Sequence, residues 1–237
     1  MEKHNPVGEV VTTSVSRTDP VQMSKNEVSA LCFKAARGAG MSWGLAEEAG
    51  FAAAWLHAQG FDGPGNLASH LNFATGMAWR DICPQVRPGQ WSASSSVPLC
   101  PVAVGATLAD HAGLPETRLA EAGLMTGPVS HPLLVLPFLA AVAQAIGKDL
   151  SVTCLGQKTG VTADGRVLGE VVALSAGEAC ELNIRIETLE VDRPAPREAL
   201  PVDLDTIEQL NIFALRTTVP PSERSRAGAG SLASDND

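Results

Sequence analysis

The chain has 237 residues, of which 45% are hydrophobic and 18% are charged, a composition typical of a globular protein with a sizeable core. The net charge is −9 and the sequence has no basic face, which argues against nucleic acid or an anionic membrane surface as a partner. The most apolar run, residues 132–143, is too short to span a bilayer, and residues 1–23 contain no apolar signal segment.

The cysteines are odd in number, widely spaced and without a CxxC pair. This pattern favours reduced, mostly buried thiols and a cytoplasmic protein. The five positions are Cys32, Cys83, Cys100, Cys154 and Cys180.

The first elements expected are a polar arm over residues 1–23 and then two helices. Ser24 and Glu27 have the spacing of a capping box and predict the start of the first helix, which the glycines at 38 and 40 should end. Ser42 is placed to cap a second helix, rich in alanine, that runs to about Gln59.

A third helix is predicted to begin at Asn66 as its cap and to carry His70. We favour a structural or surface role for His70 and leave a site role open, because its surroundings are aromatic. Residues 81–98 contain three prolines and a serine run and predict a loop between a helical part, 24–80, and a mixed part, 99–219.

The mixed part begins with a short apolar segment that ends at Asp110 and His111. An Asp–His pair can be catalytic, but neighbours in sequence point in different directions in a helix or a strand, so we favour no joint role for these two. His131 lies at the start of a buried helix that runs to Ile146, where the helix dipole disfavours its protonation. Strands are then expected at 151–155, in a hairpin over 161–171, and at 180–187, where apolar and polar residues alternate. Asp205 should open a short last helix.

These elements predict one α+β domain over residues 24–219, with about three helices first and a small antiparallel sheet with one buried helix later. The polar segment 220–237 has the composition of a disordered tail. If it were ordered, Arg226 could bind a carboxylate, and Asp235 and Asp237 could bind a cation or an amine.

The turn between the first two helices is the main candidate site. Arg37, Ser42 and Trp43 bring together a guanidinium, the N–H groups of a helix start and an indole, which suit a small carboxylate or phosphate. Glu47 and Glu48 are the acid/base candidates, although a role at the helix N-terminus competes. The alternative interpretation is an ordinary helix–turn–helix with a core tryptophan.

Two stretches carry a resemblance to a known family: AARGAGMSWGLAEEAG followed by AAAWL, and the ending RTTVPPSERSRAGAGSLASDND. Both resemble a bacterial family classed only as a domain of unknown function, and the resemblance extends over most of residues 24–237. It implies no activity. It implies a family-typical arrangement of Arg37, Ser42, Trp43, Glu47 and Glu48 with Ser222, Ser225, Arg226, Asp235 and Asp237.

No dinucleotide fingerprint, phosphate-binding loop, nucleophile elbow or HExxH motif occurs, and the five histidines are scattered. The sequence therefore predicts no metal site and leaves the cofactor unknown. Two hypotheses follow. The first is a small-molecule binding protein or enzyme that acts on an anionic metabolite. The second is a non-catalytic assembly or accessory subunit of a homo- or hetero-oligomer, for which the close-packing alanine helix and the terminal segments are the motivation.

Overall fold

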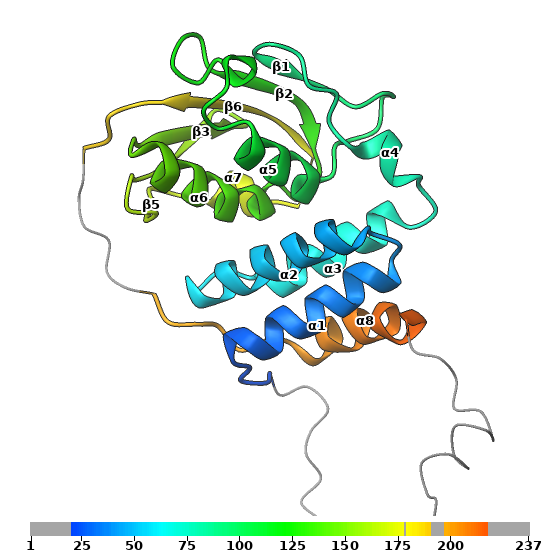
Figure 1. Cartoon of the computed structure of the whole chain (residues 1–237). Helices are drawn as coiled ribbons and strands as arrows, with labels where there is room; N and C mark the ends of the chain where they lie inside the picture. The colour runs from blue at the N-terminus through cyan, green and yellow to red at the C-terminus, as the bar shows by residue number, and fades with distance from the viewer. Residues whose placement is uncertain (1–19, 178, 191–196, 218–237) are drawn as a thin grey trace, which may run out of the picture.

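The computed structural model describes residues 20–177, 179–190 and 197–217. In these ranges the chain forms an α+β fold, with a helical part at one end and a six-stranded sheet at the other (Figure 1). The expected N-terminal arm, apart from residues 20–23, and the whole of the expected C-terminal tail, 220–237, lie outside the described residues.

The helical part consists of α1 (Lys25–Gly38), α2 (Trp43–Ala58), α3 (Gly63–Ala74) and the last helix, α8 (Leu204–Ala214). The three N-terminal helices are those predicted from the sequence. The return of α8 to pack beside α1 was not predicted (Figure 1). A short helix, α4 (Trp79–Ile82), follows at the start of the expected loop.

The start of α1 confirms the predicted capping box. The Ser24 N–H donates to Glu27 Oε2 at 2.7 Å, and the Glu27 N–H donates to Ser24 Oγ at 3.3 Å. Ser42 caps α2 as predicted, because its hydroxyl accepts the Leu45 N–H at 3.4 Å.

Two predicted helix starts were wrong. The cap of α3 is Asp62 and not Asn66: Asp62 Oδ1 accepts the Gly65 N–H at 2.8 Å, and a proline in the first turn fixes the helical start. The last helix begins at Leu204 with Asp203 as its cap residue, so Asp205 lies inside the first turn. In both cases the helix begins earlier than the polar residue chosen from the sequence.

The sheet has the strand order β1-β2-β6-β3-β4-β5. All neighbouring strands are antiparallel except β1 and β2, which are parallel, so the sheet is mixed and not purely antiparallel as predicted. The strand 180–186 shows the predicted alternation, with Cys180, Leu182 and Ile184 buried. The strands are β1 (Gln90–Trp91), β2 (Leu124–Val129), β3 (Leu150–Cys154), β4 (Gln157–Val161), β5 (Val167–Leu168) and β6 (Cys180–Ile186).

Two helices lie between the sheet and the helical part, where the sequence predicted one: α5 (Pro101–Asp110) and α6 (Leu136–Ile146) (Figure 1). Pro137 stands in the first turn of α6, where a proline is tolerated, after the 3₁₀ turn η2 (Pro132–Val135). The remaining short elements are η1 (Pro115–Thr117), α7 (Val172–Ser175) and η3 (Leu215–Thr217).

The central helix is α2, which packs against α1 and α3 on one side and against α5 and α6 on the other. Its small residues allow these close approaches. Ala46, Ala49, Ala52 and Ala53 are fully buried, and a Cβ on Gly50 would lie 2.8 Å from the Ser29 carbonyl oxygen of α1. The alanine-rich pattern of the sequence thus corresponds to a helix surrounded by other helices.

The cysteines differ from expectation. Cys154 at the end of β3 and Cys180 at the start of β6 form a disulfide between neighbouring strands. Cys32, Cys83 and Cys100 are free thiols, and burial raises the pKa of Cys100 to about 12. The prediction that all five are reduced was therefore wrong, because the sheet pairing brings together two residues that the sequence separates.

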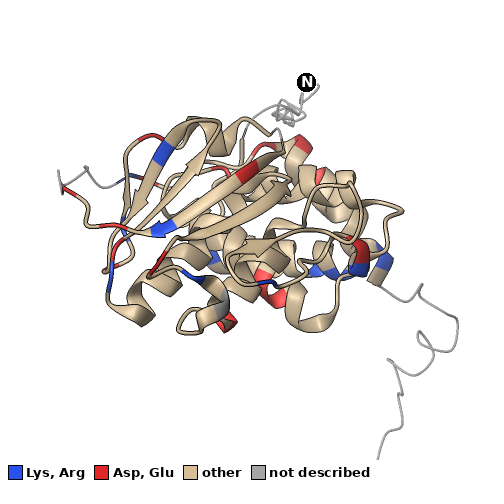
Figure 2. Cartoon of the chain, turned by 90° about the horizontal axis from the view of Figure 1, so that it is seen from above, with Lys and Arg blue, Asp and Glu red and all other residues tan. Residues whose placement is uncertain are grey.

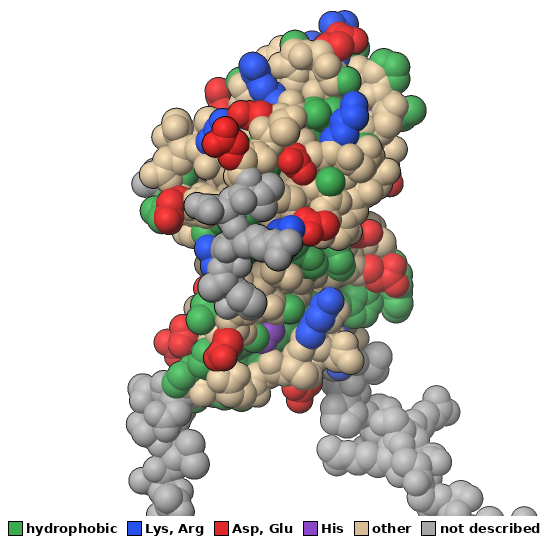
Figure 3. Space-filling model, turned by 90° about the vertical axis from the view of Figure 1, so that its left-hand side faces the viewer, with side chains coloured by type: hydrophobic (Ala, Val, Ile, Leu, Met, Phe, Trp, Pro, Cys, Tyr) green, Lys and Arg blue, Asp and Glu red, His purple; other side chains and the backbone are tan. Residues whose placement is uncertain are grey.

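Residues of both charges are dispersed along the described helices, strands and loops (Figure 2). On the face drawn in Figure 3, acidic and basic groups stand beside each other and not in one field of a single sign. None of the helices in the described ranges has the length and apolar character needed to cross a membrane.

Candidate functional site

The predicted residues of the first turn do come together at the end of α1 and the start of α2. The Arg37 guanidinium donates to the Met41 carbonyl oxygen and lies over the Trp43 ring, with Cζ 5.5 Å from the ring centroid. The Trp43 Nε1–H donates to Glu47 Oε1 at 2.8 Å. The Arg37 guanidinium is thus hydrogen-bonded within its own turn, and the Glu47 carboxylate is hydrogen-bonded to the Trp43 indole.

Trp43 is not the core tryptophan of the alternative interpretation, since 61% of its surface is exposed. Its ring meets Phe33 edge to face, with the centroids 5.3 Å apart, beside a hollow of about 430 Å³. Contacts on several sides thus hold an exposed aromatic ring in one orientation.

Glu48, the next residue of α2, is partly buried. Partial burial raises the pKa of its carboxyl, and the negative charges of Asp110 and Glu47 act in the same direction. The other sequence-predicted site residues lie outside the described residues, so their relation to the turn stays a prediction: Ser222, Ser225, Arg226, Asp235 and Asp237.

A second group of polar side chains lies where the helical part meets the sheet, and it begins with His70 on α3. His70 is fully buried, and its Nδ1 lies 2.9 Å from Ser130 Oγ, whose hydroxyl donates to the Leu99 carbonyl oxygen at 3.3 Å. The single hydrogen of the Ser130 hydroxyl is used in the bond to Leu99, so Ser130 Oγ acts as the acceptor toward His70. His70 Nδ1 therefore carries a hydrogen and donates it to Ser130 Oγ, and Nε2 is left as an acceptor. Nε2 is buried and has no hydrogen-bond partner among the described residues.

His131 stands next to this pair, at the junction of β2 and η2. Its backbone is left-handed, with φ 45° and ψ 57°, a conformation uncommon for a residue with a side chain. The His131 and His70 rings meet edge to face with centroids 6.1 Å apart, and His131 Nδ1 is also buried without a partner in the described part of the chain.

Both imidazoles are neutral at physiological pH. Burial lowers the pKa of His70 to about 3, and the nearby His131 adds to the effect. Burial also lowers the pKa of His131. The predicted low protonation of His131 was attributed to a helix dipole, whereas the structure gives burial as the cause.

His131 lines a pocket of about 310 Å³, which we call the His131 pocket. Asp62, Asn66 and Ser69 come from the first turns of α3 and its cap, Ser175 and Gly177 from α7 and the turn after it, and Thr206 and Gln209 from α8. Segments far apart in the sequence therefore meet there. Among the described residues, no lysine, arginine or large apolar side chain lines it.

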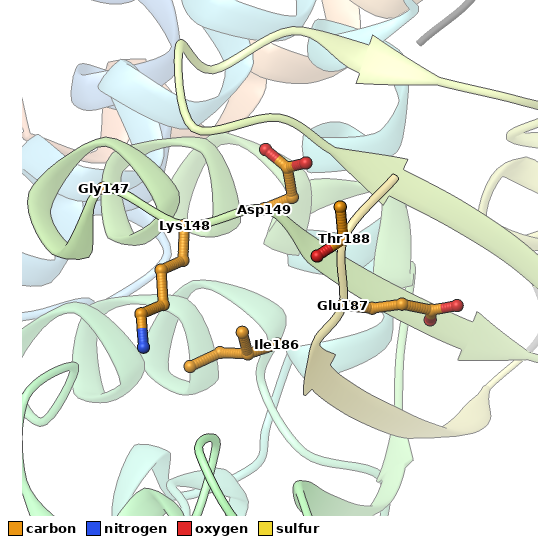
Figure 4. Close-up of a pocket in the computed structure, with 6 residues that line it drawn as sticks. All are labelled: Gly147, Lys148, Asp149, Ile186, Glu187 and Thr188. Atoms are coloured by element: carbon orange, nitrogen blue, oxygen red, sulfur yellow. The ribbon is translucent and has the colours of Figure 1, made fainter. Parts of the chain in front are cut away.

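Another pocket, of about 410 Å³, lies beside Lys148, Asp149 and Glu187 (Figure 4). Its carboxylates have structural roles. Asp149 accepts the Ala163 N–H at 2.7 Å and the Leu189 N–H at 3.2 Å, and Glu187 forms an ion pair with Lys158 at 2.7 Å. We therefore do not regard this pocket as the site.

Asp110 and His111 form no dyad, because His111 Nδ1 donates to the Thr107 carbonyl oxygen one turn earlier at 2.9 Å. Within the described ranges, no three His, Cys, Asp or Glu side chains are arranged to hold a metal ion.

Comparison with known proteins finds a family match in the N-terminal part of the chain. Residues 23–97 match a family model described as "Protein of unknown function (DUF3726)". The chain is similar to that family over α1, α2, α3, α4 and β1. No curated protein and no solved structure matches the chain.

The matched region contains the Arg37–Trp43 turn and His70, and ends before Ser130 and His131. It supports the expected similarity to an uncharacterised domain family in the N-terminal stretch only. His70 and His131 were both candidates from the sequence, but each was considered by itself. His70 is 60 positions from Ser130, the neighbour of His131. The sequence offers no signal that would have joined them.

Proposed function

We propose that this protein binds a small polar molecule in the His131 pocket. The observation that carries the proposal is the state of His131: a half-buried imidazole on a left-handed backbone, with one nitrogen buried and unpartnered among the described residues, beside a polar pocket. Unpaired buried polar groups and strained backbone are costly, and they concentrate at functional sites.

The proposal is one of binding and not of a defined reaction. Ser130 is only 2% exposed, so its hydroxyl is not accessible as a nucleophile, and its contact with His70 is best explained as support for the histidine pair. This function keeps the small-molecule hypothesis of the sequence but moves the ligand from the Arg37–Trp43 turn to the His131 pocket.

The test is a thermal-shift screen of polar metabolites on the full chain, repeated on two variants, His131→Asn and Trp43→Ala. A ligand of the folded state at 100 times its Kd adds about 2.7 kcal/mol to the free energy of unfolding, so a real ligand raises the Tm with concentration. The expected shift persists in Trp43→Ala and is lost in His131→Asn. A shift lost only in Trp43→Ala would instead place the ligand at the Arg37–Trp43 turn.

An assembly role is the second candidate, and the exposed Trp43 favours it. Large aromatic residues fixed in place before binding are typical anchors of protein interfaces. In this case we expect light scattering to give the molar mass of an oligomer for the full chain, and a lower mass, closer to that of a monomer, for Trp43→Ala. A monomer at all concentrations for the unmodified chain would contradict self-assembly.

A further inference from the structure

We infer that the ligand of the His131 pocket is a neutral polyhydroxylated molecule of about the size of a monosaccharide. The inference rests on the proposed function and adds the chemical class of the ligand. It follows from the charge of the pocket, from the absence of an apolar wall in its described lining, and from the orientation of two amide side chains.

The charge of the lining argues against an anion. Asp62 is its one charged group among the described residues, and the His131 imidazole that lines it is neutral at physiological pH. An anion would meet a carboxylate and no cation. Asp62 also attracts a cation only weakly, because it is exposed to solvent and its Oδ1 already accepts the Gly65 N–H at 2.8 Å.

The shape and surface argue against an apolar ligand. Pockets for small molecules usually have volumes of roughly 300 to 1,000 Å³ and mostly hydrophobic walls. At about 310 Å³ this pocket is at the small end, and its described lining consists of hydroxyl, amide, carboxylate and imidazole groups with two glycines. The binding free energy of a ligand in this pocket therefore comes from hydrogen bonds and not from burial of apolar area.

The two amides are complementary and already oriented. Asn66 Nδ2 donates to the Asp62 carbonyl oxygen at 2.7 Å, which leaves Asn66 Oδ1 as an acceptor. Gln209 Oε1 accepts from Asn72 Nδ2 at 3.2 Å, which leaves Gln209 Nε2 as a donor. A hydroxyl group both donates and accepts, so a molecule with several hydroxyls can use the free end of each amide.

Ser69, Ser175 and Thr206 add hydroxyl groups to the same lining, and His131 lies among them with its Nδ1 buried. Hydroxyl side chains rotate to donate or accept as the ligand requires. A ligand with hydroxyls on successive carbons therefore finds partners of either kind from α3, α7 and α8.

The experiment uses four probes with one six-membered ring: glucose, its amine glucosamine, its acid glucuronate, and cyclohexanol with a single hydroxyl. Galactose, mannose and myo-inositol extend the neutral set to other hydroxyl geometries. Binding to the full chain is followed by NMR of the histidine ring nitrogens, with the His131 signals assigned from His131→Asn. We expect at least one neutral polyol to move the His131 signals and to bind at least about tenfold more tightly than the charged probes.

The variant that tests the amide pair is Gln209→Ala, and Asn211→Ala on the same helix, outside the pocket, is its control. Loss of one hydrogen bond should weaken polyol binding about 3- to 10-fold in Gln209→Ala and by less than about twofold in Asn211→Ala. Equal effects of the two variants would overturn the role given to Gln209.

The outcomes distinguish failure of the proposed ligand class from failure of the proposed binding site. Tighter binding of glucosamine or glucuronate, with the His131 signals moved, would overturn the ligand class and leave the pocket as the binding site. If none of the polyols moved the His131 signals, the proposed ligand class would also be overturned. If the wider metabolite screen then gave no shift that depends on His131, the proposed function would fail as well.

Discussion

The backbone of Gly38, at the end of α1, lies directly against the carbonyl oxygen of Phe213 in α8. A Cβ on Gly38 would be 1.7 Å from that oxygen, a distance that no packed structure tolerates. The contact joins the first helix to the last. Since α8 also carries Thr206 and Gln209 of the His131 pocket, the fit at Gly38 contributes to placing one wall of the candidate site.

Gly38→Ala should therefore destabilise the protein. The new methyl group must push α8 away from α1, and overpacking of this kind costs about 1–3 kcal/mol. The matched control is Gly44→Ala in α2, where a Cβ would meet no atom within 4 Å and where alanine favours the helix by up to about 1 kcal/mol. Urea unfolding of both variants checks the prediction, and equal stabilities would contradict it.

His131 should tolerate asparagine far better than a β-branched residue. Asparagine adopts the left-handed conformation readily, whereas valine at φ 45° is strained. We expect His131→Val to lower the free energy of unfolding by about 1–2 kcal/mol relative to His131→Asn. Chemical denaturation gives both values. Valine as stable as asparagine would mean that the backbone there is not left-handed.

Stability should fall as the pH is lowered, because of His70. Its pKa is about 3 in the folded protein and about 6.5 in the unfolded chain, so below pH 6.5 the unfolded chain takes up a proton that the folded protein does not. Between pH 7 and pH 5 this costs about 2 kcal/mol in the free energy of unfolding. Urea unfolding at the two pH values measures the loss.

The variant His70→Gln serves as the control for this pH dependence. It should be less stable at pH 7 but should lose less on acidification, because it has no imidazole to protonate at that position. In the unmodified protein the ring signals of His70 should not titrate between pH 8 and pH 5 in NMR spectra. A titration midpoint near 6.5 would show that His70 is accessible to water.

Breaking the Cys154–Cys180 disulfide should lower stability. The two cysteines are 26 positions apart, and closing a loop of that length in the unfolded chain corresponds to about 3–4 kcal/mol in the chain-entropy model. We expect the variant with both cysteines replaced by alanine to melt lower than the oxidised protein. Reductant should lower the Tm of the unmodified chain and leave that of the variant unchanged. Cys83→Ala, at a free thiol, is the control.

The local features of the fold could be predicted where a few adjacent residues decide them. Ser24 with Glu27 and Ser42 specify helix starts through hydrogen bonds within one turn, and both were predicted correctly. The alternation of residues 180–186 specifies a strand with one buried face. The starts of α3 and α8 were misplaced because several polar residues there could act as caps, and the choice depends on where the chain enters the helix.

The candidate site was only partly accessible to the same reasoning. Arg37, Trp43 and Glu47 lie within 10 positions of one another, on either side of one turn, so their proximity follows from local geometry, although the exposure of Trp43 does not. His70, His131 and Gln209 come from three distant segments: the His131 ring meets the His70 ring, and His131 lines the pocket together with Gln209. These contacts depend on how α3 packs against η2 and α8, which is decided by side-chain packing across the whole core.

By itself, then, the sequence determined the class of the fold, the first three helices and the strand alternation, because hydrogen bonds and periodicity act over a few residues. The tertiary structure alone decided the parallel pairing of β1 with β2, the disulfide, the return of α8 to α1 and the neutral histidine pair beside the His131 pocket. Each of these depends on contacts between segments far apart in the chain, and such contacts form only when the hydrophobic core brings those segments together.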